Sequence, residues 1–351
     1  MKIENKMAQL LGVKVSQVEK TIELIDEGNT IPFIARYRKE VTGNLTDEQL
    51  RILEKNLNYL RNLNKRKEEV IKSIKDQNKL TDELLEQINR AESLKDVEDI
   101  YLPYRPKRRT RATMAREKGL EPLAQFILNW NNDRPIEEEA KEFISEEVET
   151  KEDAIAGALD IIAETISETI AFRNILRRDA EKVGQLVSEK IEIKDEKKKD
   201  EALKYDMYFD YSEKLTKVPS HRVLALNRGE KEGFLRVRID LYDEDNIFEI
   251  ASLLEPNRKK ENYPYIYRAS EDSYKRLLFP SIENEIRREL TEKADKQAID
   301  VFAANLKPYI MQAPIKETVV MGLDPGYRTG CKLVVVSEYG ELLEDTVIWP
   351  A

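Results

Sequence analysis

The chain is poor in the residues on which several classes of protein depend. Among its 351 residues there is one cysteine, Cys331, and one histidine, His221. A single cysteine excludes an intrachain disulfide framework and is typical of a reducing compartment, so we expect a cytoplasmic protein. A single histidine excludes metalloproteases of the HExxH type and zinc sites built from several histidines.

Long apolar runs are missing as well, and turn-forming residues are few. No uncharged stretch approaches the roughly 20 residues that a membrane-spanning helix needs. Glycine and proline number only 12 and 13, whereas 36% of the residues are charged. This balance favours long, solvated helices over a loop-rich β architecture. The 40% of hydrophobic residues suffice for real cores in a chain longer than one ordinary domain.

The net charge of -9 restricts what the chain can bind. Phosphate binding rests on clustered Lys and Arg side chains, so a chain with an acidic surplus cannot coat DNA or RNA over its whole surface. Any contact with nucleic acid must therefore be local. Two basic clusters are present, one around Arg36 and Arg38 and one within residues 101–118.

Residues 101–118 carry seven basic side chains against one acidic side chain. Such a segment has the composition that phosphate contacts need, and its two tyrosines are suited to stacking on unpaired bases. The candidate contacts are Tyr101, Tyr104, Arg105, Lys107, Arg108, Arg109 and Arg111. In the alternative interpretation, these arginines pair with the many carboxylates of the chain and hold its helices together.

Arg36 and Arg38 follow the apolar residues Ile31, Phe33 and Ile34. The two arginines could form the base-facing end of a recognition element. The alternative, which the apolar cluster favours, is the exposed edge of a packed turn. Helix-turn-helix geometry does not follow from spacing alone, because many helical pairs have the same loops.

Apolar periodicity predicts helices throughout the first hundred residues. Two short helices fit residues 5–26, with a break at Gly12. Thr46 and Gln49 have the spacing of a capping box, which predicts the start of a long helix. Thr81 is placed to cap the helix that follows.

Helices and one strand are predicted in the middle of the chain. Thr150 caps a helix whose apolar stripe reaches Ile175, and Ser220 caps a helix that Gly229 ends. Residues 234–240 alternate apolar and charged side chains, which indicates a half-exposed strand.

The last part of the chain changes from helix to strand. Residues 281–315 are predicted to hold a long connecting helix, and strands at 319–323, 333–336 and 342–348 are predicted to form a short antiparallel meander. The fold is therefore predicted to be mainly α. The predicted domains are an N-terminal helical domain (1–100), a central helical region with the basic segment and a small strand element (101–280), the connecting helix (281–315) and the strand region (316–351).

Asp324 follows an apolar strand and precedes Pro325 and Gly326. This arrangement looks like the opening of a ribonuclease-H-like core, in which the carboxylate could hold Mg²⁺. A two-metal nuclease must gather several carboxylates, and only Asp324 stands where the first would be. Asp324 is thus a vestigial catalytic candidate and a weak metal candidate, and no enzymatic activity is expected. Asp-Pro-Gly is also an ordinary turn sequence.

Four sequence blocks together resemble the bacterial Tex family of transcription accessory proteins. They are residues 31–43, 101–112, 220–229 and 323–332. The resemblance covers the whole chain but corresponds to roughly the first half of such a protein. It implies a helical N-terminal region with helix-turn-helix character, followed by the start of a truncated ribonuclease-H-like α/β domain of the YqgF type. It also adds Arg328, in the last block, to the basic candidates.

The leading hypothesis is an N-terminal fragment of a non-catalytic transcription accessory protein. Its expected partners are nucleic acid, either RNA or DNA, and the transcription machinery, without a membrane or a small-molecule substrate. Neither a P-loop nor a Gly-x-Gly-x-x-Gly pattern is present, so no organic cofactor is expected. A second hypothesis is a metal-dependent nuclease or resolvase that uses Asp324. A third is a scaffold that binds transcription proteins without touching nucleic acid.

Overall fold

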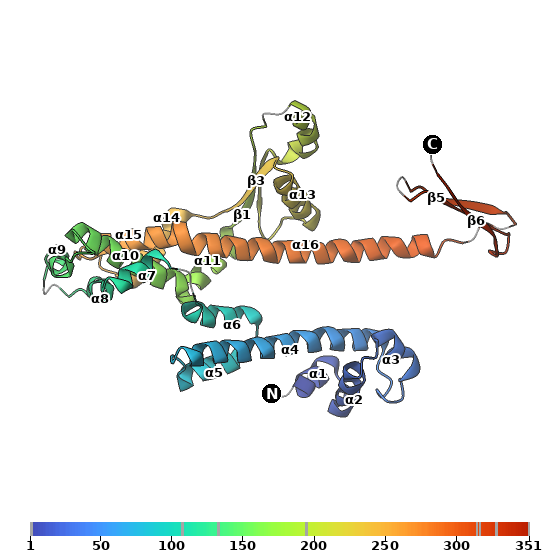
Figure 1. Cartoon of the computed structure of the whole chain (residues 1–351), viewed down its shortest axis with the longest axis horizontal. Coiled ribbons are helices and arrows are strands. Elements are labelled where there is room, and N and C mark those ends of the chain that lie inside the picture. The colour runs from blue at the N-terminus through green and yellow to red at the C-terminus, as the bar shows by residue number, and fades with distance from the viewer. Residues whose placement is uncertain are drawn as a thin grey trace. The chain divides into compact units, whose positions relative to one another are not determined.

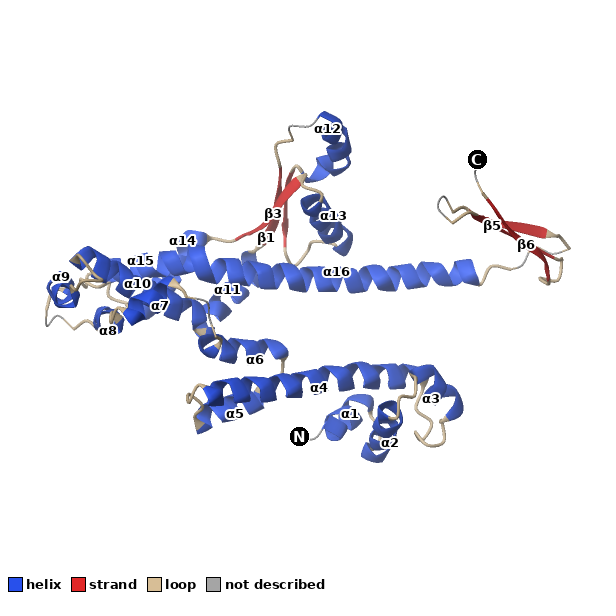
Figure 2. Cartoon of the chain, viewed as in Figure 1, coloured by secondary structure: helices blue, strands red, loops and turns tan. Residues whose placement is uncertain are grey.

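The computed structural model describes residues 3–106, 109–131, 134–193, 196–313, 315, 317–326 and 329–349. The chain divides into two units. Unit 1 contains Met1–Gly184 and Leu241–Asn284, and unit 2 contains Gln185–Asp240 and Glu285–Ala351. The described residues are mainly helical, with two small antiparallel sheets, as the sequence predicts (Figures 1 and 2).

The beginning of unit 1 is a small helical assembly. Helices α1 (Ile3–Leu11), α2 (Val15–Asp26) and α3 (Ile31–Tyr37) pack against the first half of α4 (Asp47–Asp76) (Figure 1). The apolar faces of the four helices share one core, because an amphipathic helix must bury its apolar stripe. That core includes Val18, Ile31, Ile34, Leu45, Leu50, Leu53 and Leu57. The two short helices expected before Gly28 are confirmed.

The predicted capping box at the start of α4 is confirmed. The backbone N–H of Gln49 donates to the Thr46 hydroxyl at 3.2 Å, and the backbone N–H of Thr46 donates to Gln49 Oε1 at 3.0 Å. Both bonds satisfy amide groups that have no partner within the helix. The flanking residues Leu45 and Leu50 are buried, which fixes the direction in which the chain enters α4.

Replacing Thr46 by alanine should lower the free energy of unfolding by about 1 kcal/mol, because the first turn of α4 loses a side-chain cap. Urea denaturation followed by circular dichroism would measure the change. The matched control is Thr216→Ala, at an exposed threonine for which the structure shows no side-chain cap, and it should stay within about 0.5 kcal/mol of the parent. Equal effects of the two substitutions would contradict the assignment.

A second core lies where α4 meets α5 (Asp82–Arg90) and α6 (Leu94–Tyr101). It contains Leu63, Val70, Ile74, Leu84, Ile88, Val97 and Tyr101. Thr81 caps α5 as predicted, because its hydroxyl accepts a hydrogen bond from the backbone N–H of Leu84 at 3.2 Å.

The rest of unit 1 surrounds one buried helix, α10 (Lys151–Glu168). Both apolar and small residues of α10 are buried on several sides, which is the pattern of a helix in the middle of a domain. Its neighbours are α7 (Arg111–Glu117), α8 (Glu121–Leu128), α9 (Ile136–Ala140), α11 (Ile170–Val183) and α15 (Tyr263–Asp272), with the short segments η1 (Leu102–Tyr104), η2 (Lys141–Phe143) and η4 (Ser273–Leu278). Helix α14 (Asp243–Leu254) packs against α15 and α11.

The helix predicted from Thr150 as far as Ile175 is two helices, so this prediction was wrong in its length. The backbone of Thr169 is extended, with φ -76° and ψ 119°, and it separates α10 from α11. The Thr169 hydroxyl donates to the Thr165 carbonyl at 2.8 Å. Threonine side chains compete in this way with the regular helix, and a continuous apolar stripe does not reveal such a break.

Unit 2 contains a three-stranded antiparallel sheet with strand order β2-β1-β3. Its strands are β1 (Gln185–Lys190), β2 (Asp210–Lys214) and β3 (Leu235–Asp240), and its helices include α12 (Glu196–Ala202), η3 (Leu203–Tyr208) and α13 (Ser220–Lys231). Strand β3 is the strand predicted at 234–240, and its residues alternate between buried and exposed. Strands β1 and β2 are short and rich in polar residues, so periodicity alone did not indicate them.

The predicted ends of α13 need correction. Ser220 is the first residue of the helix and not its cap, and its hydroxyl donates to the Gln297 side chain. The helix continues through Gly229 and ends before Gly233, which has a φ of +81°. Only Gly233 adopts the left-handed conformation that favours glycine at a helix end.

The last elements agree with the prediction. A π-helical segment, Ser273–Leu278, leads into the long helix α16 (Phe279–Ile310). Strands β4 (Val320–Asp324), β5 (Cys331–Val336) and β6 (Leu342–Ile348) then form an antiparallel meander. Among the described residues, no helix is both long enough and apolar enough to cross a lipid bilayer.

Candidate nucleic-acid interface

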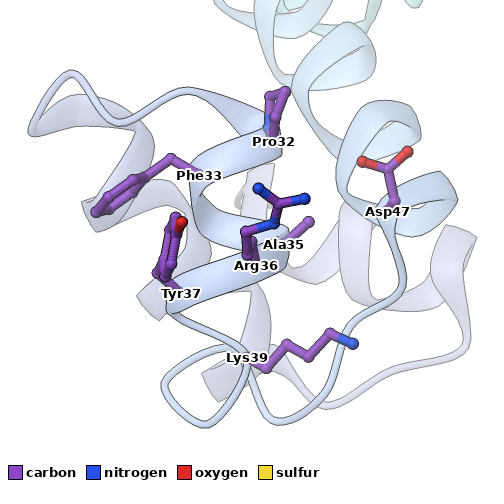
Figure 3. A pocket seen from close by; sticks show the side chains of 7 residues that line it. All are labelled: Pro32, Phe33, Ala35, Arg36, Tyr37, Lys39 and Asp47. Atoms are coloured by element: carbon purple, nitrogen blue, oxygen red, sulfur yellow. The ribbon is translucent and has the colours of Figure 1, made fainter. Parts of the chain in front are cut away.

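Helix α3 borders a surface groove of about 650 Å³ (Figure 3). Its buried face carries Ile31 and Ile34, which are 3% and 0% exposed and hold the helix on the core of unit 1. Its outer face and the turn that follows line the groove. The lining residues are Pro32, Phe33, Ala35, Arg36, Tyr37, Lys39 and Asp47.

The groove has an aromatic side. Phe33 is 36% exposed and Tyr37 is 60% exposed, and their ring centres lie 5.2 Å apart with the planes tilted by 47°. The two rings are four residues apart on one helix, which places them on the same face. The guanidinium carbon of Arg38 lies 5.2 Å from the centre of the Phe33 ring, within the range of a cation–π contact.

The groove also has a cationic side. Arg36, Arg38 and Lys39 are exposed, and no carboxylate pairs with any of them within the described part of the chain. Arg38 donates to the carbonyl of Tyr37 at 3.2 Å, which is a local contact that leaves its charge uncompensated. The acidic residue of the lining, Asp47, is paired with Arg51 at 2.7 Å. The structure therefore places Arg36 and Arg38 beside two exposed aromatic rings. Neither arginine has a carboxylate partner among the described residues.

The tyrosines of the second candidate segment are not placed for stacking. The side chain of Tyr101 lies in the second core, where its residue is 7% exposed and its hydroxyl is 2.9 Å from the Ser73 hydroxyl. Arg66 lies over the Tyr101 ring at 5.4 Å. Tyr104 is half-buried against the same core. Neither tyrosine therefore belongs to the proposed interface, because Tyr101 is buried and Tyr104 is partly covered by the same core.

The described arginines in this segment differ in whether they form an ion pair. Arg105 and Arg111 are exposed, and the structure shows no ion pair for either among the residues that it describes. Arg109 pairs with Glu117 at 2.9 Å, as the structural interpretation expects. Lys107 and Arg108 lie outside the described residues.

A buried carboxylate explains part of the basic composition. The side chain of Glu164, on α10, is 8% exposed, accepts a hydrogen bond from Arg116 at 2.7 Å and accepts another from the Thr110 hydroxyl at 2.9 Å. Burial acts to lower the pKa of Arg116, but its hydrogen bond to Glu164 and nearby carboxylates raise that pKa overall. A buried charge needs such a partner, so Arg116 and Thr110 fasten α7 to α10.

Asp324 stands at the end of β4, opposite Lys332 of β5, and is exposed. A Cβ atom added to Gly326, in the loop that follows, would lie 2.5 Å from the Gly330 carbonyl oxygen, so the loop requires glycine there. No group of three acidic, histidine or cysteine side chains that could hold a metal ion occurs in the described ranges. Arg328 is not among the described residues.

The block 220–229 attaches α13 to α16 within unit 2. Arg287 donates to Glu230 Oε1 at 3.0 Å and to Asn227 Oδ1 at 3.3 Å, and Asn227 donates to the Thr291 hydroxyl at 2.8 Å. These contacts give the block a structural role. His221 is exposed on the outer side of the helix.

Sequence reasoning overlooked Tyr37 and treated Phe33 only as part of an apolar cluster. The signal was present in the spacing. Ile31 and Ile34 fall on one face of a short helix, whereas Phe33 and Tyr37, four residues apart, fall on another. An amphipathic helix with aromatic residues on its outer face predicts an exposed platform.

Three family models match the chain. They describe a Tex-like protein N-terminal domain over residues 1–75, a Tex central region over residues 131–302 and a Tex protein YqgF-like domain over residues 318–351. The order of the models agrees with the order of the elements, because the YqgF-like match begins just before the β4–β6 meander.

Full-length comparisons agree with the family models. The chain is 45% identical over 350 residues to YdcI of Bacillus subtilis (strain 168), a match that covers 99% of the chain and 48% of YdcI. It is 37% identical over 354 residues to the transcriptional accessory protein Tex of Neisseria gonorrhoeae, covering 99% of the chain and 46% of that protein. It is 30% identical over 350 residues to the human S1 RNA-binding domain-containing protein 1, covering 93% of the chain and 34% of that protein.

The chain thus spans about half the length of its bacterial relatives. The three models follow one another in the order of the fold, and the similarity to these relatives extends over nearly all of the chain. The chain belongs to the Tex family.

Proposed function

We propose that this chain belongs to a transcription accessory protein and that it contacts nucleic acid through α3 without catalysing a reaction. The observation that carries the proposal is the combination of three exposed cations, Arg36, Arg38 and Lys39, with no carboxylate partner among the described residues. Free, clustered cations are what binding to a phosphate backbone requires. The names of two relatives, a transcriptional accessory protein and an S1 RNA-binding domain-containing protein, agree with this partner.

Helix α3 is favoured over the segment 101–118 because of how the charges are used. In that segment Arg109 and Arg116 already have carboxylate partners, so its basic composition overstates its free charge. Arg105 and Arg111 remain candidates for a supplementary contact. Their exposed guanidinium groups could neutralise further phosphates of a bound strand.

The non-catalytic part of the proposal rests on Asp324. A two-metal centre stabilises the attacking and the leaving oxygen with ions held by several carboxylates. Within the described residues Asp324 does not belong to a group of three or more acidic, histidine or cysteine side chains that could hold a metal ion. The competing function is a metal-dependent nuclease, and Mg²⁺-dependent cleavage that Asp324→Asn abolishes would replace our proposal.

The compartment remains the cytoplasm, the expectation drawn from Cys331 as the sole cysteine.

A salt titration tests the phosphate contacts. Binding of fluorescein-labelled oligo-uridine and oligo-thymidine would be followed by anisotropy at increasing salt, with the parent chain and a triple variant, Arg36→Gln, Arg38→Gln and Lys39→Gln. Each lost phosphate contact on a single strand should reduce the slope of log K against log salt by roughly 0.7, so the triple variant should lose about 2.

The matched control removes the same charge elsewhere. The control variant combines three substitutions at exposed positions of α16, which are Lys293→Gln, Lys296→Gln and Lys307→Gln. It should leave the slope of log K against log salt nearly unchanged. An equal loss in both variants would show that net charge, and not α3, governs the binding. No binding of the parent chain at low salt would reject the proposal and favour a scaffold that binds only proteins.

A further inference from the structure

We infer that the α3 groove accepts single-stranded nucleic acid and that an unpaired base stacks on Tyr37. This inference rests on the proposed function and adds to it the class of ligand. The phosphate contacts alone would not distinguish a single strand from a duplex, because both carry the same charged groups. The distinction comes from the aromatic side of the groove.

Among the described residues of unit 1, packing on the core does not explain why these two rings of α3 are exposed. Ile31 and Ile34 already attach the helix to the core, and both are almost completely buried. Phe33 and Tyr37 point away from that core and line the groove (Figure 3). Leaving two adjacent rings in water forgoes the free energy that their burial would provide, so an apolar partner for them is the simplest reason for their position.

The rings are arranged so that Tyr37 is the open one. Arg38 lies over Phe33, and Phe33 lies beside Tyr37, with 5.2 Å for each separation. Tyr37 retains 60% of its surface in solvent. A flat base can therefore cover Tyr37, while the contact with Phe33 restricts how far the tyrosine ring can turn. Stacking of this kind tolerates any base, because every base has a π face.

A recognition helix for a duplex would look different. Such a helix places its N-terminal residues against base edges in the major groove, where they must donate or accept hydrogen bonds. The N-terminal residues of α3 are Ile31, which is buried, followed by Pro32 and Phe33, none of which has a side-chain hydrogen-bonding group. Helix-turn-helix character in this region thus stays a prediction from the family resemblance, and the outer face of α3 suits stacking better than base-edge contacts.

The charges around the groove indicate where a backbone can run. Arg36, Arg38 and Lys39 follow or flank the two rings in sequence, so phosphates next to a stacked base meet cations. Asp47 lies across the groove from Phe33 and Tyr37, on the side toward which the Arg36 and Lys39 side chains extend, and it repels phosphate, although its ion pair with Arg51 weakens that repulsion (Figure 3). The strand is therefore expected on the side of the groove that holds Tyr37.

The experiment compares strand types in Tyr37 variants of the whole chain. The probes are oligo-uridine, oligo-thymidine and a DNA duplex, all fluorescein-labelled. Loss of one stacked base should weaken single-strand binding of Tyr37→Ala roughly 5- to 150-fold, the range for base–aromatic stacking, with much less effect on the duplex. Tyr37→Trp, which keeps an aromatic ring at this position, should bind single strands about as tightly as the parent chain does. Tyr59→Ala, at a 42% exposed tyrosine on α4, removes the same atoms elsewhere and should change nothing.

A second readout detects stacking directly. Stacking quenches the fluorescence of 2-aminopurine in a single-stranded probe, so the parent chain and Tyr37→Trp should quench it and Tyr37→Ala should not. Asp47→Asn should strengthen binding, because it removes a negative charge from the groove. Thermal denaturation of each variant would verify that it is folded, and little change is expected at the exposed Tyr37.

The outcomes separate the inference from the proposed function. The stacking inference is wrong if Tyr37→Ala weakens single-strand and duplex binding equally, or if it weakens neither of them. If the triple charge variant still weakens both in that case, the phosphate contacts of the proposed function are retained. If the parent chain binds no probe at low salt, both the stacking inference and the proposed function are rejected. If Asp47→Asn weakens single-strand binding, the charges of the groove do not act on a phosphate backbone as inferred, and the inference is overturned.

Discussion

Asp99→Ala is expected to lower the free energy of unfolding by about 3–5 kcal/mol, because it leaves two buried guanidinium groups without their common partner. Arg173 donates to Asp99 Oδ1 at 3.2 Å, and Arg177 donates to Oδ2 at 2.6 Å and to Oδ1 at 3.0 Å. The side chains of the three residues are only 8%, 13% and 11% exposed for Arg173, Arg177 and Asp99. These contacts join α6 to α11, which are far apart in the sequence.

The expected loss of stability is large because Arg173 and Arg177 would lose their shared carboxylate while both side chains stay in the interior. Water cannot solvate a buried arginine fully, so removal of the carboxylate exposes the desolvation penalty that it had offset. Asp99→Asn keeps the shape of the side chain and should show most of the same loss, since its amide cannot neutralise the two cations. Urea denaturation, monitored by circular dichroism, would measure both variants.

A surface pair provides the control. Glu86 and Arg90 form an ion pair one turn apart on α5, with side chains 62% and 77% exposed. Glu86→Gln should cost only about 0.3–0.5 kcal/mol, the usual worth of such a pair on a helix. If Asp99→Ala cost no more than Glu86→Gln, the charges of the α6–α11 contact would contribute nothing that water could not replace.

Gly229→Val is expected to lower the free energy of unfolding by about 2–3 kcal/mol through overpacking. A Cβ atom at position 229 would lie 2.5 Å from Leu235 Cδ1, 2.9 Å from Leu235 Cγ and 3.1 Å from Tyr205 Cδ1. Leu235 is completely buried and Tyr205 is 4% exposed, so neither side chain has room to move aside. The close approach of α13 to β3 therefore depends on glycine.

Two comparisons isolate the steric cause. Gly322→Val introduces the same side chain in strand β4, where the nearest atom to a new Cβ is 3.9 Å away, and should be almost neutral. Leu235→Ala should cost about 2–5 kcal/mol in the parent chain but clearly less in the Gly229→Val background, because it relieves the clash. Additive effects of the two substitutions would show that no clash exists between positions 229 and 235.

Helices with an apolar stripe and a recognisable cap could be predicted from the sequence. The capping box at Thr46 and the cap at Thr81 depend on neighbours three residues away, so local sequence contains all the necessary information. The alternation in β3 is equally local. Strand β1 instead pairs with β2 and β3, which lie far from it in the sequence, and the break at Thr169 lies within a continuous apolar stripe, so neither feature had a local signal.

The candidate site was predictable only in part, for a related reason. The basic residues at 36, 38 and 101–118 are visible in the sequence, but whether a cation is free depends on carboxylates elsewhere in the fold. Glu164, which is 48 residues from Arg116, is one example. Burial likewise decided between the two aromatic sets, since Tyr101 lies in a core and Tyr37 does not. Composition identifies cations and rings, and tertiary packing determines which of them can reach a ligand.

The two small sheets differ in how much of their apolar surface is covered. In the β1–β3 sheet, Leu186, Val237 and Ile239 are at most 5% exposed. In the β4–β6 meander, Met321 and Leu323 are 65% and 57% exposed, and β6 is exposed along its whole length. Because few buried contacts hold β4–β6 together, its backbone amides should open to solvent at a small fraction of the free energy that β1–β3 requires. Of the two sheets, β4–β6 is therefore expected to exchange its backbone amide hydrogens first, which hydrogen exchange would measure.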